Sequence, residues 1–363
     1  MAIQPDILAS TLRILRDREV DNTFRAIPLL DAVQRAGNVE QSDGGQKVDC
    51  PTILTEHSNI TQLSTGYEAV NLAVRDPLRT ATYNWCDFIA PIVLTEKEQL
   101  SNKGDRAVIK IAEARLKSVM GMLQREYCKQ VVAGNSTVLT ELESLNGAGI
   151  GTFGSTVRQS GWFDTLAFGS QTATVGGLAK SDYQSSWQNQ FINAAFDVGG
   201  SSGGAYDPSG ETLFRAMTQM MIQTQIYAPE GEVDIILSSP DSYELYKNSL
   251  FTQERYTSMT EERNMAGKLG LLFNGAMMYI DPNLPITGVG YNDGVDRANG
   301  KVSQYFLNSK LFNVYFDKDA YFELGDYERI SGYAAMAANI MVRTQITTAN
   351  LSGHGLLLNG EAD

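Results

Sequence analysis

The stretch of sequence that decides the fold is residues 105–133, DRAVIKIAEARLKSVMGMLQREYCKQVVA, which has no proline and one interior glycine. Apolar side chains recur in it at steps of three or four, the spacing that gathers them on one helical face. They are Val108, Ala112, Leu116, Val119, Leu123, Tyr127 and Val131. Asp105 suits an N-cap and Gly134 a stop. The pattern therefore predicts one helix about 43 Å long.

The sequence before this helix predicts extended structure. Residues 47–56 and 80–95 are rich in strand-forming side chains. Pro51 and Pro91 belong at sheet edges or bulges, because proline cannot donate to a ladder. We expect a long hairpin with its tip near residues 60–78. Such a hairpin invites aggregation unless a partner covers it, so it favours a subunit that contacts its neighbours.

The first 22 residues predict a short amphipathic helix with a charged exit, because Ile7, Leu8, Leu12 and Leu15 share one helical face. Such a helix docks either on its own domain or on another subunit. The residues favour neither arrangement over the other.

The middle of the chain, residues 134–208, is dense in Gly, Ser, Thr and Gln and predicts a loop-rich crossing between two regions. Trp162 and Trp187 are expected to hold it in place. An Asp-Pro pair at 207–208 then starts a helix through residue 226. Its interior side chains are expected to be Phe214, Met217, Met221 and Ile222.

The last third predicts further regular elements. They are a strand at 233–237, a helix at 239–250, a strand at 275–280, a strand pair at 304–307 and 311–316 around Asn308-Ser309, and a long strand at 332–347. The last strand is expected to return to the first region of the fold.

The composition describes a globular chain of 363 residues, 43% apolar and 20% charged, with a net charge of −13. This charge argues against a general nucleic-acid surface and against binding to anionic membranes, although it does not exclude enclosing DNA. The three cysteines Cys50, Cys86 and Cys128 form no disulfide framework. No signal peptide and no 18-residue apolar run occur, so we expect a soluble protein made in the cytosol.

The motifs for chemistry lack their structural context. Residues 149–154 (GIGTFG) match GxGxxG without the flanking strand and helix, and residues 199–203 (GGSSG) match GxSxG without a helix at the serine. His57 and His354 have no partner at zinc-ligand spacing and are expected to be ordinary surface or loop residues. We therefore expect no catalytic residue, no metal site and no cofactor.

Acidic side chains cluster late in the sequence. They are Asp293, Asp296, Asp317, Asp319, Glu323, Asp326 and Glu328. Carboxylates can bind calcium or act as an acid/base pair, but the EF-hand spacing is absent. A solvated face or a salt-bridge surface between subunits is the favoured interpretation. An α+β enzyme that uses residues 317–328 stays open as an alternative.

The order of these segments resembles that of tailed-bacteriophage major capsid proteins with the Hong Kong 97-type fold, which is α+β. The resemblance covers most of the chain and rests on the order and spacing of several patterns rather than on one signature. The patterns are 22–30 (NTFRAIPLL), 45–56 (GQKVDCPTILTE), 66–70 (GYEAV), 82–93 (TYNWCDFIAPIV), the helix from residue 105, and 176–190 (GGLAKSDYQSSWQNQ).

The resemblance implies a division of the chain. Residues 1–44 resemble the N-terminal arm and residues 45–82 the extended β-hairpin loop. Residues 83–207 and 331–363 resemble the peripheral domain, with the spine helix at 105–133. Residues 208–330 resemble the axial domain.

The resemblance also implies a function. The chain would be a structural protein, not an enzyme, that assembles in the host cytoplasm into the icosahedral head shell of a virion and encloses double-stranded DNA without reading its sequence. The implied partners are copies of itself in pentamers and hexamers, a portal, a separate scaffolding protein and, in some cases, a decoration protein. An encapsulin-like compartment that houses cargo enzymes is the alternative with the same fold.

Contacts between subunits are expected in the arm, whose charges suit acidic surfaces of neighbours, and in the extended loop. The side chains expected there are Arg13, Arg16, Arg18, Arg25, Ile53, Leu54 and Tyr67.

Overall fold

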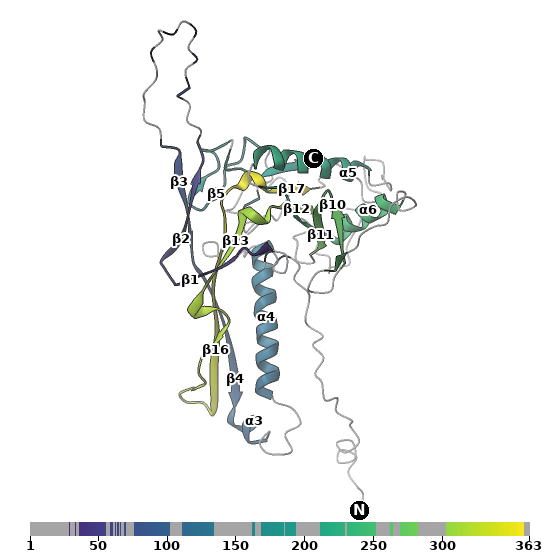
Figure 1. The fold of residues 1–363 in the computed structure, drawn as a ribbon. Helices are drawn as coiled ribbons and strands as arrows, with labels where there is room; N and C mark the ends of the chain where they lie inside the picture. The colour runs from purple at the N-terminus through teal and green to yellow at the C-terminus, as the bar shows by residue number, and fades with distance from the viewer. Residues whose placement is uncertain are drawn as a thin grey trace, which may run out of the picture.

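The computed structural model shows two main sheets with helices packed against them (Figure 1). The residues that it describes are 29, 33, 36–55, 59–60, 62, 64, 66, 69, 76–101, 111–133, 162–163, 168–184, 186–193, 211–228, 231–251, 262–263, 269–281 and 303–358. A mixed α and β architecture was predicted and is confirmed. None of the described helices is long and apolar enough to cross a membrane.

The first sheet has six strands and is organised around one long strand, β16. Its strands are β1 (Val39–Ser42), β4 (Cys86–Thr95), β13 (Phe312–Asp317), β14 (Glu323–Leu324), β15 (Glu328–Arg329) and β16 (Ala335–Thr348). β4 runs antiparallel along one side of β16, and β13, β14 and β15 follow one another along the other side. The predicted return of the last strand to the first region is therefore confirmed.

Helix α4 (Ile111–Ala133) covers one face of this sheet and continues through Gly121 without a break. Leu123, Tyr127 and Val131 are buried against the strands, while Leu116 and Val119 are half-buried. The ring of Tyr127 meets Phe88 of β4 edge to face at 5.8 Å.

The predicted helical face is confirmed where it is described. Residue 108 and the side chain of residue 112 lie outside the described part.

The second sheet has seven strands and a core of its own. In spatial order they are β7 (Gln190–Asn193), β17 (Gly355–Leu358), β12 (Ser303–Leu307), β8 (Ile235–Ser238), β11 (Ala276–Ile280), β10 (Leu269–Phe273) and β9 (Glu262–Arg263). Helices α5 (Glu211–Tyr227) and α6 (Pro240–Phe251) pack on this sheet and bury a methionine-rich cluster.

Of the four residues predicted on the inner face of α5, two are buried and two are not. Met217 and Met221 are buried, but Phe214 and Ile222 are exposed, and Leu213 and Met220 take the interior positions. A helix this rich in apolar residues fits more than one helical face, so periodicity alone cannot choose the face that meets the sheet.

The predicted pairing of strands 304–307 and 311–316 is also wrong. β12 belongs to the seven-stranded sheet and β13 to the six-stranded sheet. The link between them is a 3₁₀ turn, η2 (Ser309–Leu311), which is capped by the side chain of Asn308, since its Oδ1 accepts from the N–H of Lys310. This capping directs the chain into the other sheet instead of a tight hairpin.

The predicted hairpin is confirmed as β2 (Lys47–Ile53) paired with β3 (Leu78–Asn84). The predicted strand 80–95 is two strands, since β3 ends at Asn84 and β4 joins β16 instead. Figure 1 shows the hairpin leaving one end of the molecule, while β4, β16 and α4 form a stalk toward the opposite end. A short helix, α3 (Glu96–Ser101), follows β4 at the free end of that stalk.

Candidate assembly surfaces

The end of the β2–β3 ladder that lies away from β4 presents apolar side chains to solvent. Ile53 is 69% exposed and lies opposite Leu78, which is also exposed. Its neighbour Leu54 is 6% exposed and belongs to the core of the subunit. Leu54 was expected to contact a neighbouring subunit, and this expectation is corrected. Adjacent side chains of an extended chain point to opposite sides, so Leu54 faces the core while Ile53 faces solvent. The other expected contact residues, Arg13, Arg16, Arg18, Arg25 and Tyr67, lie outside the described residues.

The hairpin is held along the length of its ladder by the loop segment 168–190, which we call the clasp. The N–H of Thr82 in β3 donates to the carbonyl of Gly176 at 2.9 Å. The hydroxyl of Ser186 donates to the carbonyl of Leu54 at 2.7 Å. At the outer edge, Arg79 Nε donates to the hydroxyl of Tyr183 at 3.0 Å. These bonds fix the direction in which the hairpin leaves the body.

Gly176 allows the clasp to approach β3 this closely. Its φ of +56° is in the left-handed region. A Cβ at this position would lie 2.9 Å from both Ala81 Cβ and Tyr83 Cζ. A glycine is therefore required here for backbone conformation and for space.

Buried polar side chains hold the clasp together. Lys180 is fully buried, and its ammonium group donates to the carbonyl of Trp162 at 2.8 Å and to Asn189 Oδ1 at 3.1 Å. Gln188 Nε2 donates to the carbonyl of Lys180 at 2.8 Å. Gln171 Nε2 donates to the carbonyl of Asn189 at 2.7 Å. The composition of this segment predicted a loop-rich crossing. In the structure, the side chains of Gln171, Gln188 and Lys180 form a buried hydrogen-bonded network inside it.

The predicted role of the two tryptophans of residues 134–208 is confirmed. Trp162 and Trp187 are fully buried, and the indole N–H of Trp187 donates to the carbonyl of Val175 in the short strand β5 (Thr174–Val175). β5 pairs with β6 (Leu178–Ala179) and closes the turn that carries Gly176.

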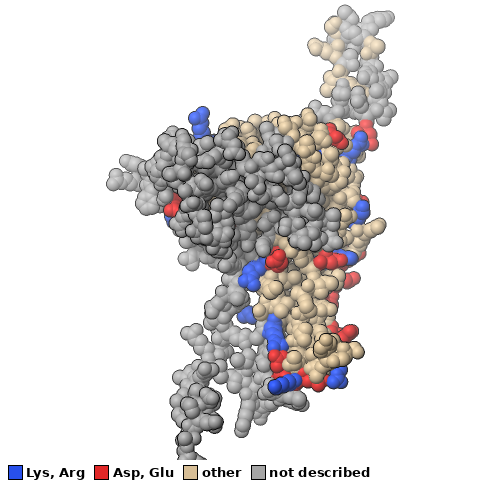
Figure 2. Space-filling model, turned by 180° about the vertical axis from the view of Figure 1, so that it is seen from behind, with Lys and Arg blue, Asp and Glu red and all other residues tan. Residues whose placement is uncertain are grey.

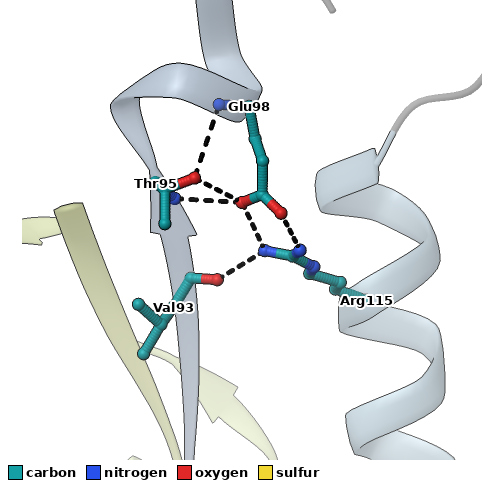
Figure 3. Close-up of polar contacts among 4 residues, drawn as sticks. All are labelled: Val93, Thr95, Glu98 and Arg115. Atoms are coloured by element: carbon teal, nitrogen blue, oxygen red, sulfur yellow. Dashed lines mark hydrogen bonds and ion pairs between the residues drawn. The ribbon is translucent and has the colours of Figure 1, made fainter.

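The free end of the stalk is tied together by one carboxylate (Figure 3). Arg115 of α4 meets Glu98 with two nitrogens, at 3.0 and 2.5 Å, and donates to the carbonyl of Val93 at 2.7 Å. Thr95 and Glu98 also cap α3 reciprocally, since each backbone N–H donates to the other side chain. Hydrogen bonds from Arg115 and then from Thr95 lower the pKa of Glu98 to about 2.

Figure 2 views the molecule from behind and shows red and blue side chains gathered at the free end of the stalk; between that end and the body the surface is mainly tan, with red and blue side chains along its margins. The charged residues there include the Glu98–Arg115 pair and the pair between Glu96 and Arg329.

Two members of the acidic cluster, Asp293 and Asp296, lie outside the described residues, and the rest separate in the fold. Asp317 is buried, accepts from the N–H of Asp319 at 3.1 Å and lies 3.6 Å from Arg343. Glu323 and Glu328 are exposed on strands beside β16. Among the described residues, no group of three or more acidic, cysteine or histidine side chains is placed to hold a metal ion.

His354 was expected to be an ordinary surface or loop residue. It does lie in the connection before β17, but it is fully buried where the two sheets meet, so a surface position is wrong. Its Nδ1 accepts from the backbone N–H of Asn308 at 3.3 Å, and its Nε2 lies 3.2 Å from Thr348 Oγ1 at the end of β16. Its ring stacks on Trp162 with 5.5 Å between centroids. Burial lowers the pKa of His354 to about 3, so the imidazole is neutral and joins the sheets. His57 lies outside the described residues.

Comparison with known proteins gives matches by structure only, since no family model and no curated protein matches the sequence. A cyanophage A-1(L) capsid chain matches with a TM-score of 0.61 at 12% identity, over 95% of this chain and 96% of that one. The capsid of Myoviridae phage XM1 matches with a TM-score of 0.54 at 8% identity, over 97% and 98%. The SrpI encapsulin of Synechococcus elongatus PCC 7942 matches with a TM-score of 0.55 at 8% identity, over 98% and 95%.

The solved structures that resemble this chain are thus mostly capsid proteins of tailed phages, with an encapsulin among them. From hairpin to stalk, the chain has the fold that these shell proteins share.

Proposed function

We propose that this chain is the major capsid protein of a tailed bacteriophage and that it self-assembles into an icosahedral head shell around double-stranded DNA. The observation that carries the proposal is that the structural match spans nearly the whole length of both chains. A cyanophage capsid chain and this chain match over 96% and 95% of their lengths. The division into arm, extended loop, spine helix and axial domain at residues 1–44, 45–82, 105–133 and 208–330 belongs to this proposal.

The arrangement of rigid and extended parts supports the same function. A closed shell places one kind of subunit in pentamers and hexamers, so the subunit needs a rigid body and extensions that reach its neighbours. The stalk, tied at its tip by Glu98 and Arg115, and the two sheets, joined at His354, supply the body. The clasped hairpin, with Ile53 and Leu78 exposed at its end, supplies an extension.

The net charge suits a container for DNA. At −13 the chain repels phosphate, and an inner wall that binds its contents weakly lets them pack and leave. A portal and a separate scaffolding protein belong to this proposal as further partners.

The alternative function is an encapsulin-like compartment, which the likeness to the SrpI encapsulin favours. The two functions share the shell and differ in the contents. A phage head holds nucleic acid, whereas a compartment of this kind holds protein cargo.

Electron microscopy of the purified full-length protein tests the shared part. We expect closed shells or rings of five and six subunits, and a fixed small oligomer would contradict both functions. Co-expression with the neighbouring genes then separates them. Particles that protect DNA from nuclease support the phage head, and particles that retain a protein and no nucleic acid support the compartment.

A further inference from the structure

The sheet face that points away from α4 carries an exposed apolar strip. The side chains of β4 alternate, and Ile92 and Leu94 are buried toward α4. On the opposite side, which we call the outer face, Ile89 is 61% exposed and Val93 is 44% exposed. Across the ladder Ile89 lies opposite Met341 and Val93 opposite Ala337, so the strip extends onto β16.

The strip consists of two rows of paired residues across the strands, and each row ends in a carboxylate. Glu323 of β14 lies opposite Met341, and Glu328 of β15 lies opposite Ala337. Both glutamates are exposed, and within the described residues neither takes part in an ion pair. The outer face therefore has two rows, Ile89–Met341–Glu323 and Val93–Ala337–Glu328, that match a segment with apolar side chains beside basic ones.

The chain contains such a segment near its N-terminus. Residues 7–16 (ILASTLRILR) carry five large apolar side chains, and four of them share one helical face: Ile7, Leu8, Leu12 and Leu15. Arg13 and Arg16 are the charged residues of this segment, and it has no acidic residue. Its apolar and positive character complements the apolar and negative character of the outer face.

We propose that the outer face of one subunit binds residues 7–16 of a second copy of the chain. This inference rests on the proposed shell-forming function and names one surface that its assembly uses. The three leucines and Ile7 pack on Ile89 and Val93, and the two arginines pair with Glu323 and Glu328.

The proposed shell favours a second copy over the same chain. The chain enters the sheet at β1, beside β13, and β13 pairs with β16 at residues 344–348. The strip lies at residues 337–341, roughly 10–20 Å further along β16 at about 3.3 Å per residue. A shell packs subunits side by side, so the segment of a neighbouring subunit approaches the exposed strip from outside.

A charge exchange in the full-length chain tests the pairing. The face variant is Glu323→Lys with Glu328→Lys, and the segment variant is Arg13→Glu with Arg16→Glu. We expect each to lower the yield of shells about tenfold or more and the combination of all four changes to restore most of it. The control, Glu244→Lys on α6, changes an exposed charge away from the outer face and should leave the yield unchanged. A combined variant no better than the single ones overturns the proposal.

A mixing experiment decides between the copies. Subunits with Ile89→Asp keep the segment and lose the face, and subunits with Arg13→Glu and Arg16→Glu do the reverse. Binding between copies predicts that the mixture forms more shells than either variant alone, and an unimproved mixture overturns it. If the unmodified chain forms no shell, the proposed function fails, and the same variants are compared by self-association in sedimentation velocity. Binding of residues 7–16 to the outer face is then supported if the combined variant restores self-association, and is overturned if it does not.

Discussion

The neutral imidazole of His354 makes the fold sensitive to acid. Its pKa in the folded chain is about 3, below the ordinary 6.5, so the unfolded chain binds the proton more readily between these values. The free energy of unfolding is therefore highest above pH 6.5 and falls as the pH drops, by about 1.4 kcal/mol per pH unit for one proton. Urea unfolding of the unassembled subunit from pH 7.5 to 5 measures this slope.

The variant His354→Gln should be less stable at pH 7.5 and should lose most of the slope between pH 6.5 and 5. His57→Gln is the matched control, because it removes the other histidine of the chain. Equal slopes in the unmodified chain and His354→Gln would show that another group causes the acid sensitivity.

Substituting two neighbouring glycines can distinguish the cost of backbone strain from the cost of steric overlap. Gly176 and Gly177 both have positive φ, at +56° and +74°. A Cβ on Gly176 meets Ala81 and Tyr83 at 2.9 Å, whereas a Cβ on Gly177 meets nothing within 4 Å. We expect Gly177→Ala to cost about 1 kcal/mol from strain alone. We expect Gly176→Ala to cost about 2–4 kcal/mol, because overpacking adds to the strain. Denaturant unfolding of both variants gives the difference, and equal costs would mean that the clasp yields freely.

At the scale of elements, the capped helix α3 should depend on the charge of Glu98. With a pKa lowered to about 2, the folded chain keeps the Glu98 carboxylate ionised and bonded to Arg115 and Thr95 until the pH nears 2. The stability that these bonds contribute is full above pH 4.5 and falls as the pH drops from there toward 2. We expect Glu98→Gln to increase hydrogen exchange of the α3 amides several-fold at pH 5, where the unmodified carboxylate is ionised.

Glu96→Gln is the control for this measurement. It removes the exposed pair with Arg329 and leaves the Glu98 contacts in place, so protection of α3 should be nearly unchanged. Equal loss of protection in both variants would assign the effect to net charge at the stalk tip instead.

Elements with a strong local pattern were predictable from the sequence. The face of α4 repeats at the helical period, and the β2–β3 hairpin combines strand-forming residues with a break between them. The interior of α5 and the partners of β12 and β13 were not predictable, because several choices satisfy the local pattern. Packing between elements distant in sequence decides among them, and no spacing in the sequence records that packing.

The same distinction applies to the candidate surfaces. The hairpin as an exposed extension followed from its composition, but the clasp that aims it did not, because Lys180 and Gln188 resemble ordinary loop residues. The apolar strip of the outer face is visible only once β4 and β16 are paired. The polar interior of the clasp and the strip across β4 and β16 both arise from tertiary contacts. The sequence therefore predicts the elements but not the contacts between them.

At the scale of the whole molecule, two adjacent residues distinguish folding from assembly. Ile53 is largely exposed at the end of the hairpin, so Ile53→Asp should change the free energy of unfolding of the subunit by about 0.5 kcal/mol or less. Its neighbour Leu54 is part of the core, and Leu54→Asp buries a carboxylate at a cost of several kcal/mol, about enough to unfold the subunit. Circular dichroism melting of the two variants should therefore differ sharply.

Assembly should respond in a different order. We expect Ile53→Asp to remain a folded subunit and to fail to form shells in electron microscopy, because a charge replaces an apolar contact that a neighbour covers. Ile53→Val keeps the surface apolar and should assemble as the unmodified chain does. If Ile53→Asp formed shells at the normal yield, the end of the hairpin would not be a contact between subunits, and the extension would have to act through residues beyond β2 and β3.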